Sequence, residues 1–279
     1  MPMRSVRKVR VTCRNRGWNG FVGVVILMLL FGAPVLTAQS LEQEEKSRPF
    51  IGSWSPSIGR GTTRAGSEER GNCGGRLGDY GEKINNCGIP VDELPLNKRG
   101  EAWLVFADHA ASPAQSECAN LNIPSVSGSG VVISAYLDKL VLQHPDPMSV
   151  IPREVWMDGR GHPPAKLLWQ QGHSIGHWEG DDLVVETTNF TFDPDGIDDH
   201  LHMASSVRKK VTERYQAIDK DHLRLIITLE DPVFLTRPFK FSFALTREAG
   251  GIRPSWNNCD PDVARREIEY SYPGEKYKE

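Results

Sequence analysis

Short alternating or apolar segments that recur at regular intervals are the feature that most constrains the fold of this chain. They begin after Gly130 and are divided by turns rich in Asp, Pro and Gly. The segments are Val131–Tyr136, Lys139–His144, Glu154–Asp158, Ser174–Trp178, Asp182–Thr188, Val207–Gln216, His222–Glu230 and Phe239–Arg247. About eight strands joined by short polar turns predict a mainly β fold. We expect an antiparallel up-and-down barrel of lipocalin type or a strongly curved sheet, with a β-sandwich as the alternative.

Alternation within the segments indicates which side chains face the interior. One face of residues 207–216 is wholly polar, whereas the other carries Val207, Lys209, Val211, Glu213 and Tyr215. Because successive strand residues point to opposite faces, we expect this second set to point inward, as do Phe241 and Phe243 in the last segment. A carboxylate on an apolar face is costly unless it is paired. We therefore expect Lys209 to be the partner of Glu213, or one of them to lie in water at the rim.

The stretch Gly172–Phe190 predicts a β-hairpin. Its first arm is Ser174–Trp178, its turn is Gly180–Asp182, and its return strand is rich in β-branched residues. Two histidines and a tryptophan lie on the first arm, and Glu186 lies on the second.

The N-terminus predicts export. Six basic and no acidic residues surround or precede an apolar run that ends near Ala38, which is typical of a secretory signal peptide. An uncleaved anchor is the alternative. We expect three parts: a signal peptide at 1–38, an irregular and partly flexible disulfide-tied segment at 39–128, and an antiparallel β domain at 129–279 with a short C-terminal helix. A strand at Trp103–Ala107 is expected in the middle part. The location would be periplasmic or extracellular.

Charge and cysteine content agree with this compartment. Removing the six basic residues takes the formal net charge from −3 to about −9, which argues against nucleic acid as a partner. We expect no stable membrane span after signal cleavage. Four cysteines remain, and we favour the disulfide pairs Cys73–Cys87 and Cys118–Cys259 among the three possible connectivities.

Several motifs carry a family resemblance. The segments Glu154–Pro163, Gly172–Thr187 and Glu213–Tyr215 occur in this order. They resemble a family of uncharacterised exported bacterial proteins with an MDGR-HP … GxSxGxWEGDxLVVET … ER(F/Y) pattern. The resemblance covers roughly residues 154–246. It implies a β-rich secreted domain and no particular reaction.

The candidate site residues fall into three groups. Carboxylates and imidazoles that could act as acid and base are Glu213, His173, His177 and Glu186. Residues that could line a ligand pocket are Trp156, Trp178, His162, Lys209, Tyr215, Phe241 and Phe243. A divalent metal could be held by His200 and His202, whose spacing puts two imidazoles on one side of an extended segment. No cofactor is required by the sequence.

Three functions follow as hypotheses. The first is an exported binding protein for an apolar or cyclic small molecule. The second is a hydrolase, lyase or isomerase that uses Glu213 and a histidine, with or without a divalent metal. The third is a structural envelope protein without a pocket. The sequence leaves the oligomeric state open.

Overall fold

The computed structural model describes residues 41–56, 76–77, 83–84, 89, 93–106, 118–146, 149, 151–199 and 202–252. The chain divides into two compact units after Glu45, and the larger one comprises residues 46–279. In that unit nine strands close into a β-barrel, which confirms the prediction of a mainly β barrel. The signal peptide and the C-terminal helix lie outside the described residues and stay predictions.

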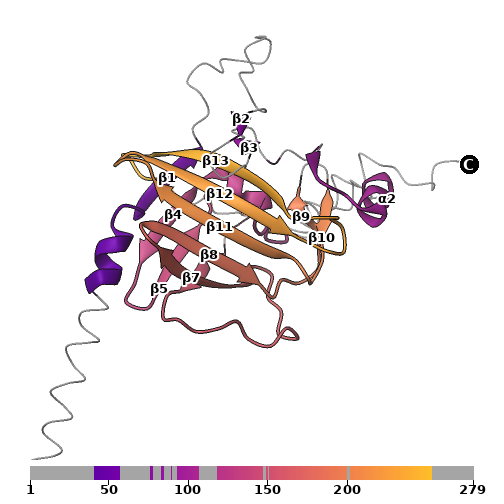
Figure 1. Ribbon diagram of the computed structural model, residues 1–279, viewed down its shortest axis with the longest axis horizontal. Coiled ribbons are helices and arrows are strands. Elements are labelled where there is room, and N and C mark those ends of the chain that lie inside the picture. The colour runs from indigo at the N-terminus through magenta and orange to yellow at the C-terminus, as the bar shows by residue number, and fades with distance from the viewer. Residues whose placement is uncertain are drawn as a thin grey trace, which may run out of the picture. The chain divides into compact units, whose positions relative to one another are not determined.

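The barrel strands follow the chain order, interrupted by other elements between β1 and β4 and between β8 and β11 (Figure 1). They are β1 (Gly52–Pro56), β4 (Val131–Ala135), β5 (Lys139–Gln143), β6 (Arg153–Trp156), β7 (His173–Glu179), β8 (Asp182–Thr188), β11 (Lys210–Ala217), β12 (His222–Glu230) and β13 (Phe239–Arg247). Strand β1 pairs with both β4 and β13, and this closes the barrel.

Smaller elements surround the barrel. The inserted β9 (Asp193–Asp198) and β10 (Met203–Ser205) form a two-stranded ribbon. Strands β2 (Arg76–Leu77) and β3 (Lys83–Ile84) extend the sheet beside β13. A 3₁₀ helix, η3 (Ser125–Ser129), precedes β4, and a helix, α2 (Lys98–Phe106), lies in the N-terminal part.

The long strands β11, β12 and β13 lie side by side and supply much of the core (Figure 1). On β12 and β13, Ile227 is opposite Phe241 and Leu225 is opposite Phe243. Each pair joins an aliphatic side chain to an aromatic ring, and all four are buried. The expected inward face of β11 is confirmed at residues 209, 211, 213 and 215, which are all buried. The prediction was wrong for Val207, which is exposed because the strand begins after it.

The predicted hairpin is β7–β8. Glu179 pairs with Asp182, so the loop is the two residues Gly180 and Asp181. Gly180 has a φ of +62°, a conformation that glycine adopts without strain. The hairpin therefore follows directly from the local sequence.

One neighbouring pair of barrel strands departs from the antiparallel order. Strands β6 and β7 are parallel, with Val155 opposite Ser174 and Trp156 opposite Ile175. Because parallel neighbours cannot be joined by a tight turn, residues 157–172 connect β6 to β7 as a long loop. This loop, not a strand, builds the candidate site described below.

Two features come from the segment that was expected to be irregular. Strand β1 belongs to the barrel, and its Trp54 is fully buried. The strand expected at Trp103–Ala107 is wrong, because residues 98–106 form α2. Asn97 caps this helix by accepting hydrogen bonds from the amides of Arg99 and Gly100, a local signal that outweighs the β-prone side chains that follow.

Candidate functional site

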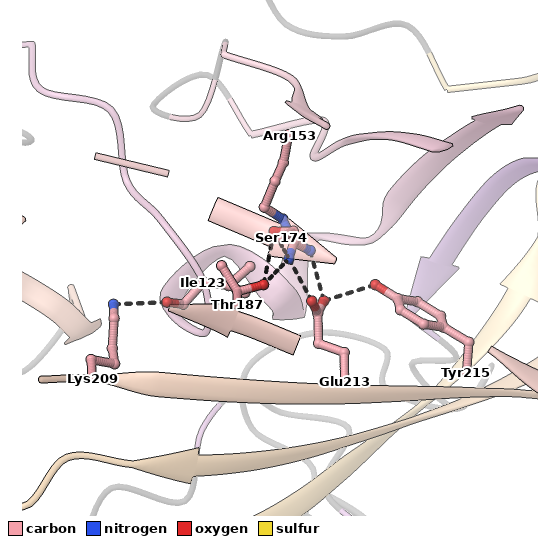
Figure 2. Close-up of polar contacts among 7 residues, drawn as sticks. All are labelled: Ile123, Arg153, Ser174, Thr187, Lys209, Glu213 and Tyr215. Atoms are coloured by element: carbon pink, nitrogen blue, oxygen red, sulfur yellow. Dashed lines mark hydrogen bonds and ion pairs between the residues drawn. The ribbon is translucent and has the colours of Figure 1, made fainter. Parts of the chain in front are cut away.

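A charged network lies inside the barrel (Figure 2). Glu213 of β11 is fully buried and accepts two hydrogen bonds from Arg153 of β6, at 2.6 and 2.9 Å. The Tyr215 hydroxyl donates to the same carboxylate at 2.8 Å. Arg153 also donates to Thr187 Oγ1 at 2.9 Å, and Ser174 Oγ lies 2.8 Å from that oxygen. Four consecutive barrel strands, β6, β7, β8 and β11, thus meet around one buried ion pair.

The electrostatics of this network favour a closed pair. Burial disfavours the charge on Arg153, but the adjacent Glu213 outweighs that effect and the pKa of the guanidinium is raised. Burial raises the pKa of Tyr215 well above its ordinary value, and Glu213 adds to the shift. Both carboxylate oxygens of Glu213 are engaged and neither is exposed, so we do not assign this residue an acid or base role.

The expected pairing of Lys209 with Glu213 is wrong. Lys209 is 1 % exposed, and its Nζ donates to Asn122 Oδ1 and to the carbonyls of Ile123 and Gly196, at 2.5–2.9 Å. Figure 2 shows the contact with Ile123. Its Nζ also lies 4.2 Å from the centre of the Phe190 ring. Burial lowers its pKa to about 7, opposed by Asp193 and Asp231. Lys209 therefore links the start of β11 to residues 122–123 and to Gly196 of β9. The partner of Glu213 is Arg153, which the sequence analysis did not single out.

A cleft of about 720 Å³ lies where the 157–172 loop meets the beginnings of β6 and β7. Its walls combine aromatic rings with a few polar groups. The lining includes Ile151, Pro152, Arg153, Glu154, Trp156, Arg160, Pro163, Leu167, Trp169, Gln170, Gln171, Gly172, His173 and Ser174. Arg153 and Ser174 border the cleft, but their side chains are buried in the network inside the barrel, whereas Trp156 and His173 lie on the outward side of their strands.

Cations hold the Trp156 ring at the cleft. The Arg160 guanidinium lies 3.7 Å from the centre of this ring, and Lys139 Nζ lies 4.9 Å from it. Arg160 is fixed in turn by Asp158, whose pKa its hydrogen bonds lower to about 2. The indole is therefore oriented before any ligand arrives.

The loop over the cleft is anchored by its neighbours. Asn189 has a φ of +61°, and its Nδ2 donates to the carbonyls of Leu167 at 2.8 Å and Pro164 at 3.2 Å. Gly172 has a φ of +69°, and a Cβ there would come within 2.9 Å of Thr187, Thr188 and Phe190. Residues 120–122 bind the side chains or carbonyls of Gln170 and Gln171. Hydrogen bonds from Asn189 and from residues 120–122 thus hold the loop that lines the cleft.

Two of the singled-out histidines meet beside the cleft. His162 Nδ1 lies 3.0 Å from His173 Nδ1, with the rings inclined at 74°. Burial lowers the pKa of both rings: Lys210 adds to the effect at His162, where Glu186 opposes it, while His162 and Arg160 add to it at His173. Trp169 covers His173 with a ring separation of 6.0 Å.

The other singled-out residues lie elsewhere. His177 is exposed and contacts Glu179 at 3.1 Å. Trp178 is half-buried against Phe50, with ring centres 5.6 Å apart. Glu186 forms an ion pair with Lys210 at 2.6 Å on the outer face. Phe241 and Phe243 pack against each other in the core, with ring centres 5.7 Å apart, and do not line the cleft.

The metal site expected at His200 and His202 stays a prediction. His200 lies outside the described residues. His202 is buried and its Nδ1 lies 2.8 Å from Asp195 Oδ1. Across the described part of the chain, no group of three or more His, Cys, Asp or Glu side chains is already arranged to hold a metal.

Comparison with family models, with curated proteins and with solved structures finds no match to this chain. The family resemblance and the expected export therefore remain predictions. Within the part of the chain that the structure describes, no helix has both the length and the apolar character to span a membrane. Of the four mature cysteines, Cys118 alone lies among the described residues, so the disulfide pairing also stays a prediction.

Proposed function

We propose that the chain is an exported binding protein for an apolar or cyclic small molecule, and that the ligand occupies the cleft beside the 157–172 loop. The observation that carries this proposal is the cleft itself: about 720 Å³, lined by Trp156 and Trp169 together with the polar residues Arg160 and His173. Ligand sites are typically concave, largely apolar and furnished with a few placed polar groups.

The chemistry of the walls suggests the ligand class. Two indoles present flat apolar surfaces that suit a ring, because aromatic pairs contribute about 0.5–1.5 kcal/mol beyond area burial. Beside the indoles, Arg160 and His173 line the cleft with ring or guanidinium nitrogens that can donate hydrogen bonds. A ligand with a planar ring and a hydrogen-bond acceptor at one end matches this arrangement. The core phenylalanines, which were expected to line the pocket, serve stability in this proposal.

Titration of the purified full chain with 1-anilinonaphthalene-8-sulfonate tests the site. We expect one molecule to bind per chain, and Trp156→Ala to weaken binding by about tenfold, equivalent to roughly 1.4 kcal/mol. Tyr136→Ala removes an exposed aromatic ring outside the cleft and should leave the affinity unchanged. Equal affinities for the two variants would contradict the proposal. Native mass spectrometry of protein from its own host would then identify the natural ligand.

A further inference from the structure

The side chains of His162 and His173 contact each other through their Nδ1 atoms. The two Nδ1 atoms face each other at 3.0 Å, and each ring comes from a different element: His162 from the loop and His173 from the beginning of β7. Two protonated Nδ1 atoms cannot face each other at this distance. At most one proton lies between the rings, so at least one of the two Nδ1 atoms presents a lone pair.

Protein contacts leave this pair incompletely satisfied. A single N–H···N bond uses one nitrogen of each ring, while His162 Nε2 is buried and has no partner among the described residues. Two imidazoles that bind one tetrahedral ion at about 2.0–2.1 Å would place their nitrogens about 3.3 Å apart. The observed separation differs from this by only a few tenths of an ångström, so both rings could bind one ion with little movement.

A carboxylate lies on the same outer face. In the β7–β8 register Ile175 is opposite Glu186 and His173 is opposite Thr188, so Glu186 is the diagonal neighbour of His173. Diagonal neighbours are close enough for long side chains to meet. Glu186 also interacts electrostatically with His162. It now pairs with Lys210, from which a cation between the histidines could draw it by a change of side-chain rotamer.

The two rings are held in place before any ion binds. Gly172 sets the backbone before His173, and Asn189 holds the loop that follows His162. Binding would therefore require little ordering of the chain.

We propose that His162 and His173 hold a divalent transition-metal ion of the zinc class through their Nδ1 atoms, with Glu186 as the third ligand. Imidazole nitrogens suit zinc, copper, iron and nickel, and one carboxylate completes a three-ligand site with an open position. His173 lines the cleft, so the open position lies at its edge. The proposal does not depend on ligand binding in the cleft and would stand if the fluorescent probe failed to bind.

Zinc titration of the full chain, purified without a histidine tag and stripped with a chelator, tests this site. We expect one zinc ion per chain by isothermal titration calorimetry. His162→Gln and His173→Gln should each weaken zinc binding by about 100-fold or more, and Glu186→Gln by about tenfold. His222→Gln is the matched control, because His222 is an exposed histidine that contacts Asp219 on another turn, and its zinc affinity should stay within about twofold.

A second measurement uses the unaltered chain and does not depend on the folding of any variant. Diethyl pyrocarbonate modifies accessible imidazoles, and peptide mass spectrometry reports each site. We expect zinc to protect His162 and His173 from modification and to leave His177 and His222 as reactive as before. Absence of stoichiometric zinc binding, equal affinity in the His173→Gln and His222→Gln variants, or protection of neither ring would overturn the proposal.

Discussion

The free energy of unfolding should depend on the buried ion pair between Arg153 and Glu213. Removing one partner of such a pair leaves an uncompensated buried charge, which costs about 3–5 kcal/mol. We therefore expect Arg153→Met to lower the free energy of unfolding by that amount in urea titrations. Arg214→Ala is the control, since Arg214 is on the same strand as Glu213 but pairs with Asp182 on the outer face, where the loss should stay below about 1 kcal/mol. Similar losses in both variants would contradict this assignment.

The ion pair between Arg153 and Glu213 could be predicted only in part from the alternation of residues along the strands. Alternation placed Glu213 inside correctly, because the period of a strand is a local property. It could not name the partner, because Arg153 is separated from Glu213 by 60 residues and meets it across the two intervening strands β7 and β8. A local signal did exist: Arg153 is two residues before the buried Val155 and so shares its inward face.

His144 makes stability depend on pH. It is buried, its ring contacts the Gly130 carbonyl at 2.7 Å, and burial together with the Arg153 charge lowers its pKa from 6.5 to about 4, with Glu213 opposing. Because the folded pKa lies below the unfolded one, the stabilisation is present above pH 6.5 and is lost as the pH falls towards 4. From pH 7.5 to pH 5 we expect the free energy of unfolding to drop by about 2 kcal/mol from this residue.

Urea titrations at the two pH values measure this drop. In His144→Asn the side-chain amide can still donate to Gly130, but the titrating group is gone, so the pH dependence should flatten by about 2 kcal/mol. The same slope in the variant and the unaltered chain would assign the pH dependence to other groups.

At the scale of elements, the 157–172 loop depends on Asn189. Its positive φ suits asparagine, and its amide group donates to Leu167 and Pro164. Asn189→Asp keeps the size and shape of the side chain but replaces its Nδ2 donor with a carboxylate oxygen, which then faces the carbonyls of Leu167 and Pro164. We expect a loss of about 1–3 kcal/mol in unfolding free energy, because these acceptors lose their partner. Hydrogen exchange at the amides of Leu167 and Trp169 should accelerate.

Asp181→Asn is the control for this change. It makes a similar amide–carboxylate exchange at the β7–β8 turn, away from the loop, and should leave exchange at Leu167 and Trp169 as in the unaltered chain. Protection in Asn189→Asp equal to that in the control would show that the loop is held by other contacts.

The elements differ in how well the sequence foretells them. The β7–β8 hairpin follows from a Gly-Asp turn between two β-prone arms, all within local reach. The parallel pairing of β6 with β7 does not, because turn residues in the 157–172 loop are equally compatible with an antiparallel return. The candidate cleft arises from that parallel pair. For this reason its tryptophans and histidines could be singled out, but their meeting point could not be located.

At the scale of the whole molecule, the barrel closes through a strand that the sequence hardly marks. Strand β1 is five residues long and precedes the next barrel strand by more than 70 residues, yet it pairs with β4 on one side and β13 on the other. Such a long-range pairing has no periodic signature, because its partners are chosen by the closure of the sheet. Without it, β4 and β13 would present open edges of the kind that template aggregation.

Trp54 is the anchor of this closure. It is fully buried, its Nε1 donates to the Phe50 carbonyl at 2.8 Å, and Arg247 of β13 lies 4.1 Å from the centre of its ring. Replacing a buried tryptophan with alanine costs about 3–5 kcal/mol. We expect Trp54→Ala to lower the free energy of unfolding by this amount and to produce oligomers in size-exclusion chromatography with light scattering, because weakened β1 pairing uncovers two strand edges.

Trp169→Ala provides the comparison. Trp169 is 43 % exposed and lies on the loop, so its removal should cost less than about 1 kcal/mol and leave the oligomeric state unchanged. If Trp54→Ala were destabilised and still showed the same oligomeric state as Trp169→Ala, the core would need this ring but closure would not. If neither variant lost stability, β1 would not be needed for the stability of the barrel, which the other eight strands would then supply.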